Sequence, residues 1–157
     1  MTEKTKKVCS AEELLPILED VIKNSGTFPL TITGTSMTPL LYNIRDSVNL
    51  ISPKSKPPKK YDIVFFQRKN GKLVLHRIIK VLPDNKLLIN GDSQMWTETI
   101  NNNQIIAVVK SYKRKGKLTD CNSFSFKLYS ILWCSLKPFR PFIFKISKCI
   151  KKIFKRK

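Results

Sequence analysis

Short apolar runs, each closed by a turn signal, restrict the folds open to this chain more than any other feature. They occupy residues 28–33, 48–51, 63–66, 73–81, 86–90 and 104–112. Asn70-Gly71 is a strong hairpin signal, and Pro83-Asp84-Asn85 marks another tight turn. Short strands joined by close turns predict a mostly β fold, built as an antiparallel folded sheet or barrel. We expect residues 94–103 to be irregular and 104–112 to form the last strand.

The two ends of the chain differ from this middle part. Ser10 and Glu13 have the spacing of a capping box, and the apolar residues that follow have helical spacing up to Asn24-Ser25-Gly26. We therefore predict three parts: an N-terminal helix in residues 1–26 packed on the domain, a β domain in 27–118, and a tail in 119–157.

The tail reads as a basic amphipathic helix. Its apolar residues repeat at helical spacing and lysines occupy the other face. The apolar set is Phe142, Ile143, Ile146, Cys149, Ile150, Ile153 and Phe154. The basic set is Lys145, Lys148, Lys151, Lys152 and Lys155. The net charge of +19 implies an anionic partner, and roughly fourteen Lys and Arg lie in residues 113–157 against the single acid Asp120. We favour an anionic membrane surface over nucleic acid, for which no binding motif is present. The remaining alternative is a helix packed on the domain.

Gly34-Thr-Ser-Met-Thr-Pro39, hereafter the serine corner, follows the first predicted strand. Gly34 accepts backbone angles closed to other residues, and Pro39 keeps Thr38 out of the helical region. Such a turn exposes Ser36 and leaves its own N–H beside it. An accessible oxygen and a nearby donor are what an acyl-transfer nucleophile needs, although the same residues also make ordinary turns.

His76 is the only histidine of the chain. A serine hydroxyl needs a base within hydrogen-bond reach, and imidazole with its ordinary pKa near 6.5 is largely neutral at pH 7. His76 lies in the predicted strand 73–81. The strands between Ser36 and His76 can return the chain, so that the imidazole lies near the serine. A structural histidine held by a neighbour is the competing interpretation.

Four marks in order resemble the signal peptidase clan of serine peptidases: Gly-x-Ser-Met-x-Pro at the serine corner, Asp62-Ile-Val, His76-Arg-Ile and Gly91-Asp92. The resemblance covers roughly residues 27–112 and implies a signal-peptidase-type β fold. The clan contains enzymes with serine and lysine and others with serine and histidine. His76 makes this chain similar to the second type, found in archaea and the endoplasmic reticulum.

The resemblance implies further roles at the site. Ser36 is the expected nucleophile, with its own N–H as oxyanion donor, and His76 is the expected general base. The group that orients His76 stays open between Asp92, which matches the Gly-Asp mark and which we favour, and Glu98, close to where the histidine-type enzymes carry a second carboxylate. Asp62 is expected to be structural, and Gly34 offers no side chain to the oxyanion.

These features together predict a serine endopeptidase that removes a leader or signal segment from a peptide or small protein at a membrane surface. The four cysteines show no metal-ligand spacing, so no metal and no cofactor are expected. Residues 14–22 do not form a signal peptide and no run is long enough to span a bilayer, so we expect a cytoplasmic protein bound peripherally to the inner face of the membrane. A non-catalytic membrane or nucleic-acid adaptor, or a self-cleaving regulator, are the alternatives.

Overall fold

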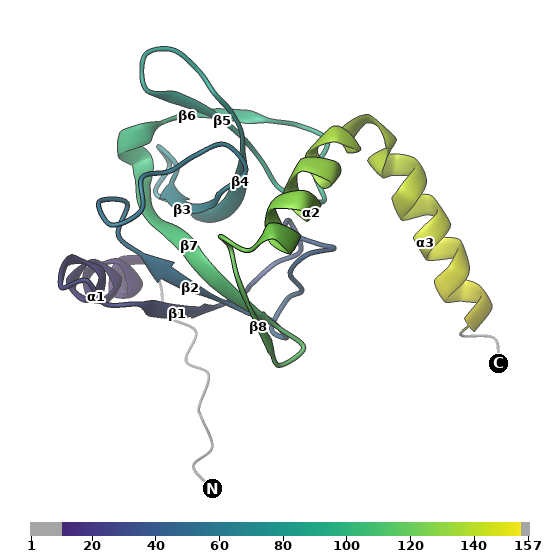
Figure 1. The fold of residues 1–157 in the computed structure, drawn as a ribbon, viewed down its shortest axis with the longest axis horizontal. Coiled ribbons are helices and arrows are strands. Elements are labelled where there is room, and N and C mark those ends of the chain that lie inside the picture. Colours follow the sequence, from purple (N-terminus) through teal and green to yellow (C-terminus); the bar gives the residue numbers. More distant parts are fainter. Residues whose placement is uncertain (1–10, 155–157) are drawn as a thin grey trace, which may run out of the picture.

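The computed structural model describes residues 11–154, and a curled β domain forms its centre (Figure 1). The strands are β1 Phe28–Thr31, β2 Ser47–Ile51, β3 Ile63–Gln67, β4 Leu73–Val81, β5 Lys86–Asn90, β6 Glu98–Asn101, β7 Ile105–Arg114 and β8 Lys117–Asp120. They pair in the order β1-β2-β7-β3-β4-β5-β6, with β8 on β7, and all of these pairs are antiparallel. The predicted mostly β, antiparallel fold is confirmed.

The sheet bends because its long strands pair with different partners along their length. β7 pairs through Ile105–Val108 with β3, through Val108–Lys113 with β2 and through Ser111–Arg114 with β8. Register shifts interrupt the pairs β2–β7, β3–β7 and β4–β5. Such bulges increase the local twist of a strand, which lets one sheet fold over on itself.

β3 explains why one run of the sequence is almost entirely apolar. Alternate side chains of a strand point to opposite faces, and both faces of β3 are buried. Ile63 and Phe65 belong to one core cluster, whereas Val64 and Phe66 belong to the other. The first cluster also contains Met37, Leu40 and Leu41, which lie in or just after the serine corner, and two residues of the N-terminal helix, Leu18 and Ile22.

Helix α1, Ala11–Lys23, covers the β1 end of the sheet (Figure 1). Leu18 and Ile22 lie four residues apart on its inner face and are buried. The predicted capping residue Ser10 lies outside the described residues.

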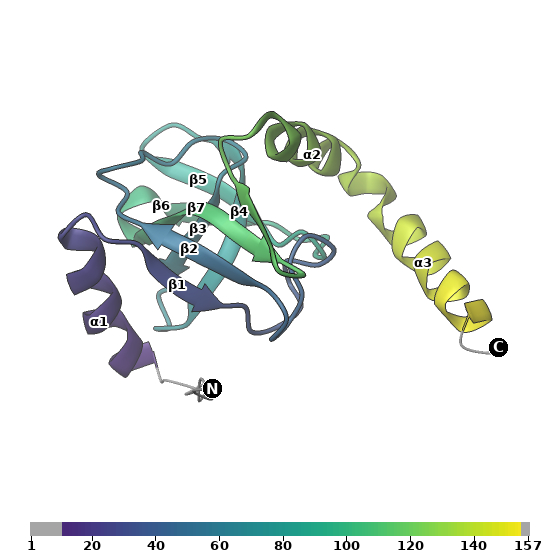
Figure 2. The ribbon, with the colours of Figure 1, turned by 60° about the horizontal axis from the view of Figure 1, so that its bottom comes forward.

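Two C-terminal helices follow the sheet. α2, Phe124–Ser135, is capped by Ser123, whose hydroxyl accepts from the Phe126 N–H; the short 3-10 helix η2, Lys137–Phe139, joins it to α3, Arg140–Phe154. α2 lies against the β domain, and α3 extends away from it on the side opposite α1 (Figure 2). The predicted C-terminal helix is confirmed. Within residues 11–154, no helix has the length and apolar character that crossing a bilayer requires.

Two predictions about the strands were wrong. The stretch 94–103, predicted to be irregular, contains β6 and the 3-10 helix η1, Asn102–Gln104. β6 was missed because it is a short strand with one buried apolar residue, Ile100. The strand 104–112 is also not the last, since Lys115 and Gly116 both adopt positive φ and turn the chain into β8.

Candidate active site

The serine corner lies in the connection between β1 and β2. Gly34 has a φ of +87°, in the region that favours glycine, and its N–H donates to Asn43 Oδ1 at 2.9 Å. The backbone N–H and the hydroxyl of Thr38 both donate to the Thr35 carbonyl, at 3.1 and 2.7 Å. These bonds close a tight turn around Ser36, which stays partly exposed.

Ser36 is held by its carbonyl and not by its hydroxyl. The Ser36 carbonyl accepts from the backbone N–H of Ser93 at 2.9 Å and from the Ser93 hydroxyl at 3.1 Å. In the part of the chain that the structure describes, neither the hydroxyl nor the N–H of Ser36 has a hydrogen-bond partner. Both groups that a peptide substrate would need are therefore unoccupied by protein atoms.

His76 lies in the middle of β4, opposite Val64 of β3. Its side chain is buried, with Phe66 and Trp96 as ring neighbours at centroid distances of 6.1 and 6.2 Å. This burial lowers the pKa of His76 from 6.5 to about 4, although the nearby Glu98 carboxylate acts in the opposite direction. The imidazole is therefore neutral at pH 7, the form that accepts a proton.

Glu98, the first residue of β6, is the carboxylate that lies within ion-pair distance of His76 among the described residues. Its Oε1 lies 3.2 Å from His76 Nδ1, within ion-pair distance, but the two atoms are not aligned for a hydrogen bond. Arg68 fixes the same carboxylate from the other side, donating from Nε to Oε2 at 2.7 Å and from a terminal nitrogen to Oε1 at 2.5 Å. The bidentate pair raises the pKa of Arg68 and limits how Glu98 can turn.

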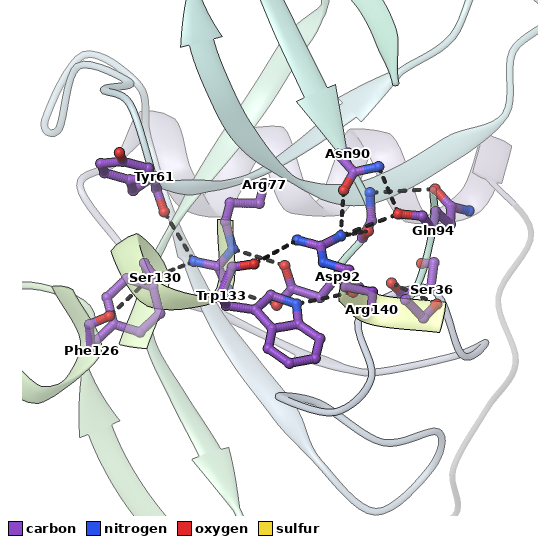
Figure 3. A network of polar contacts seen from close by, with 12 residues as sticks. Ser36, Tyr61, Arg77, Asn90, Asp92, Gln94, Phe126, Ser130, Trp133 and Arg140 are labelled. Carbon is purple, nitrogen blue, oxygen red and sulfur yellow. Dashed lines mark hydrogen bonds and ion pairs between the residues drawn. The ribbon is translucent and has the colours of Figure 1, made fainter. Parts of the chain in front are cut away.

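Asp92, which we favoured as the group that orients His76, binds Arg77 instead of the imidazole, whereas Glu98 lies within ion-pair distance of it. Arg77 donates from Nε and from a terminal nitrogen to the two Asp92 oxygens, at 2.9 and 2.8 Å (Figure 3). Both side chains are almost fully buried. Burial alone would lower the pKa of Arg77, but the charge of Asp92 and its hydrogen bonds to the guanidinium act together in the opposite direction, and the pKa is raised. The Arg77–Asp92 pair is a structural clamp behind the site.

The clamp also holds the C-terminal helices. Arg77 donates to the Tyr61 carbonyl at 3.1 Å and to the Ser130 hydroxyl of α2 at 2.7 Å, and the Trp133 indole N–H donates to the Asp92 carbonyl at 3.0 Å (Figure 3). Arg140, the first residue of α3, is fully buried and donates to Asn90 Oδ1 at 2.7 Å and to the Gly91 carbonyl at 3.3 Å.

Residues 91–98 connect the serine corner to the histidine. At one end Gly91 and Ser93 lie against Ser36, and a Cβ on Gly91 would come within 2.8 Å of the Ser36 carbonyl oxygen. At the other end Trp96 and Glu98 contact His76. The two predicted catalytic side chains therefore flank the same segment, although no hydrogen bond joins the Ser36 hydroxyl to the imidazole among the described residues.

Other candidate residues have structural partners. Asp62 accepts from Lys56 Nζ and from the Lys59 backbone N–H, both at 2.9 Å, so it fixes the preceding loop. Among residues 11–154, no cluster of His, Cys, Asp and Glu could hold a metal ion.

Sequence reasoning missed Arg68, Ser93 and Arg140, because neither their neighbours nor their spacing shows that folding brings them to the site.

The comparison with protein families assigns most of the sequence to a known group. A family model described as Peptidase S24-like matches residues 2–112, which include Ser36, His76, Asp92 and Glu98 and end before α2. A comparison with curated proteins gave no match. Since the family model covers more than half of the 157 residues, the chain belongs to the Peptidase S24-like family and, at this level, to the serine-type peptidases.

Proposed function

We propose that this protein is a Ser/His endopeptidase of the signal-peptidase type, which removes a leader or signal segment from a peptide or small protein at a membrane surface. The observation that carries the proposal is the buried, neutral His76 with Glu98 at one ring nitrogen, linked through residues 91–98 to a partly exposed serine. A serine-lysine site would need an amine in the place of this imidazole, and β4 has His76 followed by Arg77 there.

In the proposed reaction, Ser36 Oγ attacks the substrate carbonyl carbon while its proton passes to His76. Because Nδ1 faces Glu98, Nε2 is the nitrogen that takes the proton. Glu98 stabilises the imidazolium that forms, and the Ser36 N–H donates to the oxyanion. His76 then protonates the leaving amine, and water hydrolyses the acyl enzyme by the same steps. Hydrogen bonds of this kind are often long in a free enzyme and tighten when substrate binds.

The substrate we propose is an extended peptide that adds as a strand beside the site. β1 and β6 end the strand order, so each has an edge without a strand partner in the described sheet. β1 leads into the serine corner, and β6 begins with Glu98. Backbone hydrogen bonds to such an edge would give affinity, and small side chains before the cut would fit the resemblance to signal peptidases.

The membrane part of the proposal concerns α3. An amphipathic helix with lysines on its polar face is suited to the surface of an anionic bilayer, where each basic residue contributes about 1 kcal/mol. Bound in this way, the protein would be a peripheral membrane protein, with an anionic surface and a precursor peptide as its two partners.

The test is to incubate the protein with a mixed library of peptides and identify new termini by mass spectrometry. Ser36→Ala and His76→Ala should each lower the rate of cleavage by about 10³-fold or more, and the double variant should lose little further. Glu98→Gln should lower it by about 10²-fold or more, whereas Asp84→Asn, an exposed carboxylate in the β4–β5 turn, serves as the matched control. Equal cleavage by wild type and Ser36→Ala would refute the proposal.

Self-cleavage is the second candidate, and the family assignment favours it because S24-type peptidases include self-cleaving proteins. It predicts that purified wild type yields two fragments on storage and that Ser36→Ala stays intact. A rate of fragmentation independent of protein concentration would identify an intramolecular reaction. An adaptor without activity predicts neither fragments nor cleaved peptides.

A further inference from the structure

Helix α2 is apolar on two opposite faces. Phe126, Ser130 and Trp133 point toward the β domain and are buried. The opposite face carries apolar side chains that remain exposed, at 80% for Phe124, 45% for Leu128, 44% for Ile131 and 53% for Leu132. A helix packed on one side only usually has a polar outer face. Clustered exposed apolar side chains of this size indicate a surface that binds a partner.

Exposed apolar side chains also occur along the next helices. Leu136, Phe139, Phe142, Ile146 and Ile150 are between 39% and 69% exposed, and the last three repeat every four residues along α3. Phe144 lies on another face of α3 and packs edge-on against Trp133, with ring centroids 6.1 Å apart. The apolar face of α3 is therefore not the one that contacts α2. We call Phe124, Leu128, Ile131, Leu132, Leu136, Phe139, Phe142, Ile146 and Ile150 together the outer helical face.

The charge around this face identifies its partner. The sequence from Cys121 to Phe154 contains Lys and Arg but no Asp or Glu. Lys127 of α2 and Lys145 of α3 are exposed beside the apolar residues. Protein–protein interfaces are depleted in lysine, whereas apolar helix faces bordered by lysine suit the boundary between lipid head groups and acyl chains.

We propose that the whole outer helical face, α2 as well as α3, is the surface with which this protein binds an anionic bilayer. The inference rests on the proposed function and deepens it. It assigns membrane contact to a helix that is fixed to the β domain, so that binding sets the orientation of the active site as well as its location.

The connection from this face to the serine corner is short and buried. Trp133 of α2 bonds to the Asp92 carbonyl, and Arg140 of α3 bonds to Asn90 and to the Gly91 carbonyl (Figure 3). Gly91 and Ser93 in turn lie against the Ser36 carbonyl. When the outer helical face binds the bilayer, these contacts keep Ser36 at a constant distance from the membrane surface. The active site would then favour substrates that are presented at the membrane.

Flotation of the full-length protein with vesicles tests the proposal. Wild type should float with phosphatidylcholine vesicles that contain phosphatidylglycerol and bind pure phosphatidylcholine far more weakly. The double variant Leu128→Ser/Leu132→Ser, on α2 alone, should weaken binding to the anionic vesicles about thirtyfold, because two half-exposed leucines no longer enter the bilayer. The matched control is Leu118→Ser on β8, where a leucine 61% exposed lies outside the outer helical face and binding should be unchanged.

Three outcomes would overturn the proposal. The first is wild-type binding by the α2 variant with a wild-type circular dichroism spectrum, and the second is equal binding to neutral and anionic vesicles. The third is a stable dimer in light scattering that the α2 variant loses, which would make a second copy the occupant. The same flotation with Ser36→Ala separates this inference from the proposed function, because vesicle binding does not require a competent active site. If Ser36→Ala floats like wild type but wild type cleaves no peptide, the proposed function is refuted and the membrane inference is not.

Discussion

The buried imidazole of His76 makes the stability of this protein depend on pH in a defined window. Its pKa is about 4 in the folded protein and 6.5 ordinarily, so the unfolded chain binds the proton more tightly. Stability is independent of this group above about pH 7 and falls as the pH drops from 6.5 toward 4. At about 1.4 kcal/mol per unit of pKa difference, the loss reaches about 2 kcal/mol by pH 5 and about 3 kcal/mol at pH 4.

The perturbation that isolates this effect is His76→Gln, which removes the titrating group and keeps a side chain of similar size. Urea denaturation followed by tryptophan fluorescence gives the free energy of unfolding of both proteins between about pH 4.5 and 7.5. The difference between wild type and variant should shrink by about 2 kcal/mol from pH 7 to pH 5. If the difference between the two free energies of unfolding stays constant over this pH range, the view that His76 is buried in its neutral form is refuted. Because His76 is the only histidine, an NMR titration of its ring protons checks the same pKa directly.

Three further substitutions test the surroundings of the site. Arg68→Gln removes a charge that lowers the pKa of His76, so the acid limb of the pH–rate profile should move to higher pH, whereas Arg68→Lys should keep it in place. Gly91→Ala places a methyl group 2.8 Å from the Ser36 carbonyl oxygen and should lower the cleavage rate at least about tenfold by displacing the serine corner. Arg77→Met should lower the free energy of unfolding in urea by about 3–5 kcal/mol, because it leaves a buried carboxylate unpaired; a change below about 1 kcal/mol would contradict that view.

The strands could be predicted from the sequence wherever local signals and burial agree. β4 and β5 have the predicted limits, because each is bounded by turn residues that leave little freedom. β6 has no such signal, since its residues Glu98, Thr99 and Asn101 are polar and it owes its existence to pairing with β5. A strand that depends on its neighbour's backbone cannot be found from its own side chains.

The residues of the candidate site also fall into those that local sequence indicates and those that only the folded structure brings together. Ser36 and His76 could be proposed from their own chemistry and local context, whereas the preference for Glu98 over Asp92 depends on which cations fold toward the two carboxylates. Arg77 binds Asp92 and Arg68 holds Glu98 against the imidazole. Arg77 adjoins His76 in the sequence, yet its side chain points to the opposite side of β4, as alternate residues of a strand do. Arg68 reaches Glu98 only because β3 to β6 form one continuous part of the sheet.

The measurement that tests the central claim most directly is covalent labelling of the free protein by a fluorophosphonate, followed by peptide mass spectrometry. The account predicts a single adduct on Ser36, formed at a rate that falls about 10³-fold in His76→Gln and rises with pH around the low pKa of the imidazole. It predicts a smaller loss in Glu98→Gln. Labelling of Ser36 at the same rate in wild type and His76→Gln, with both proteins folded, would contradict the assignment of His76 as the base that activates Ser36.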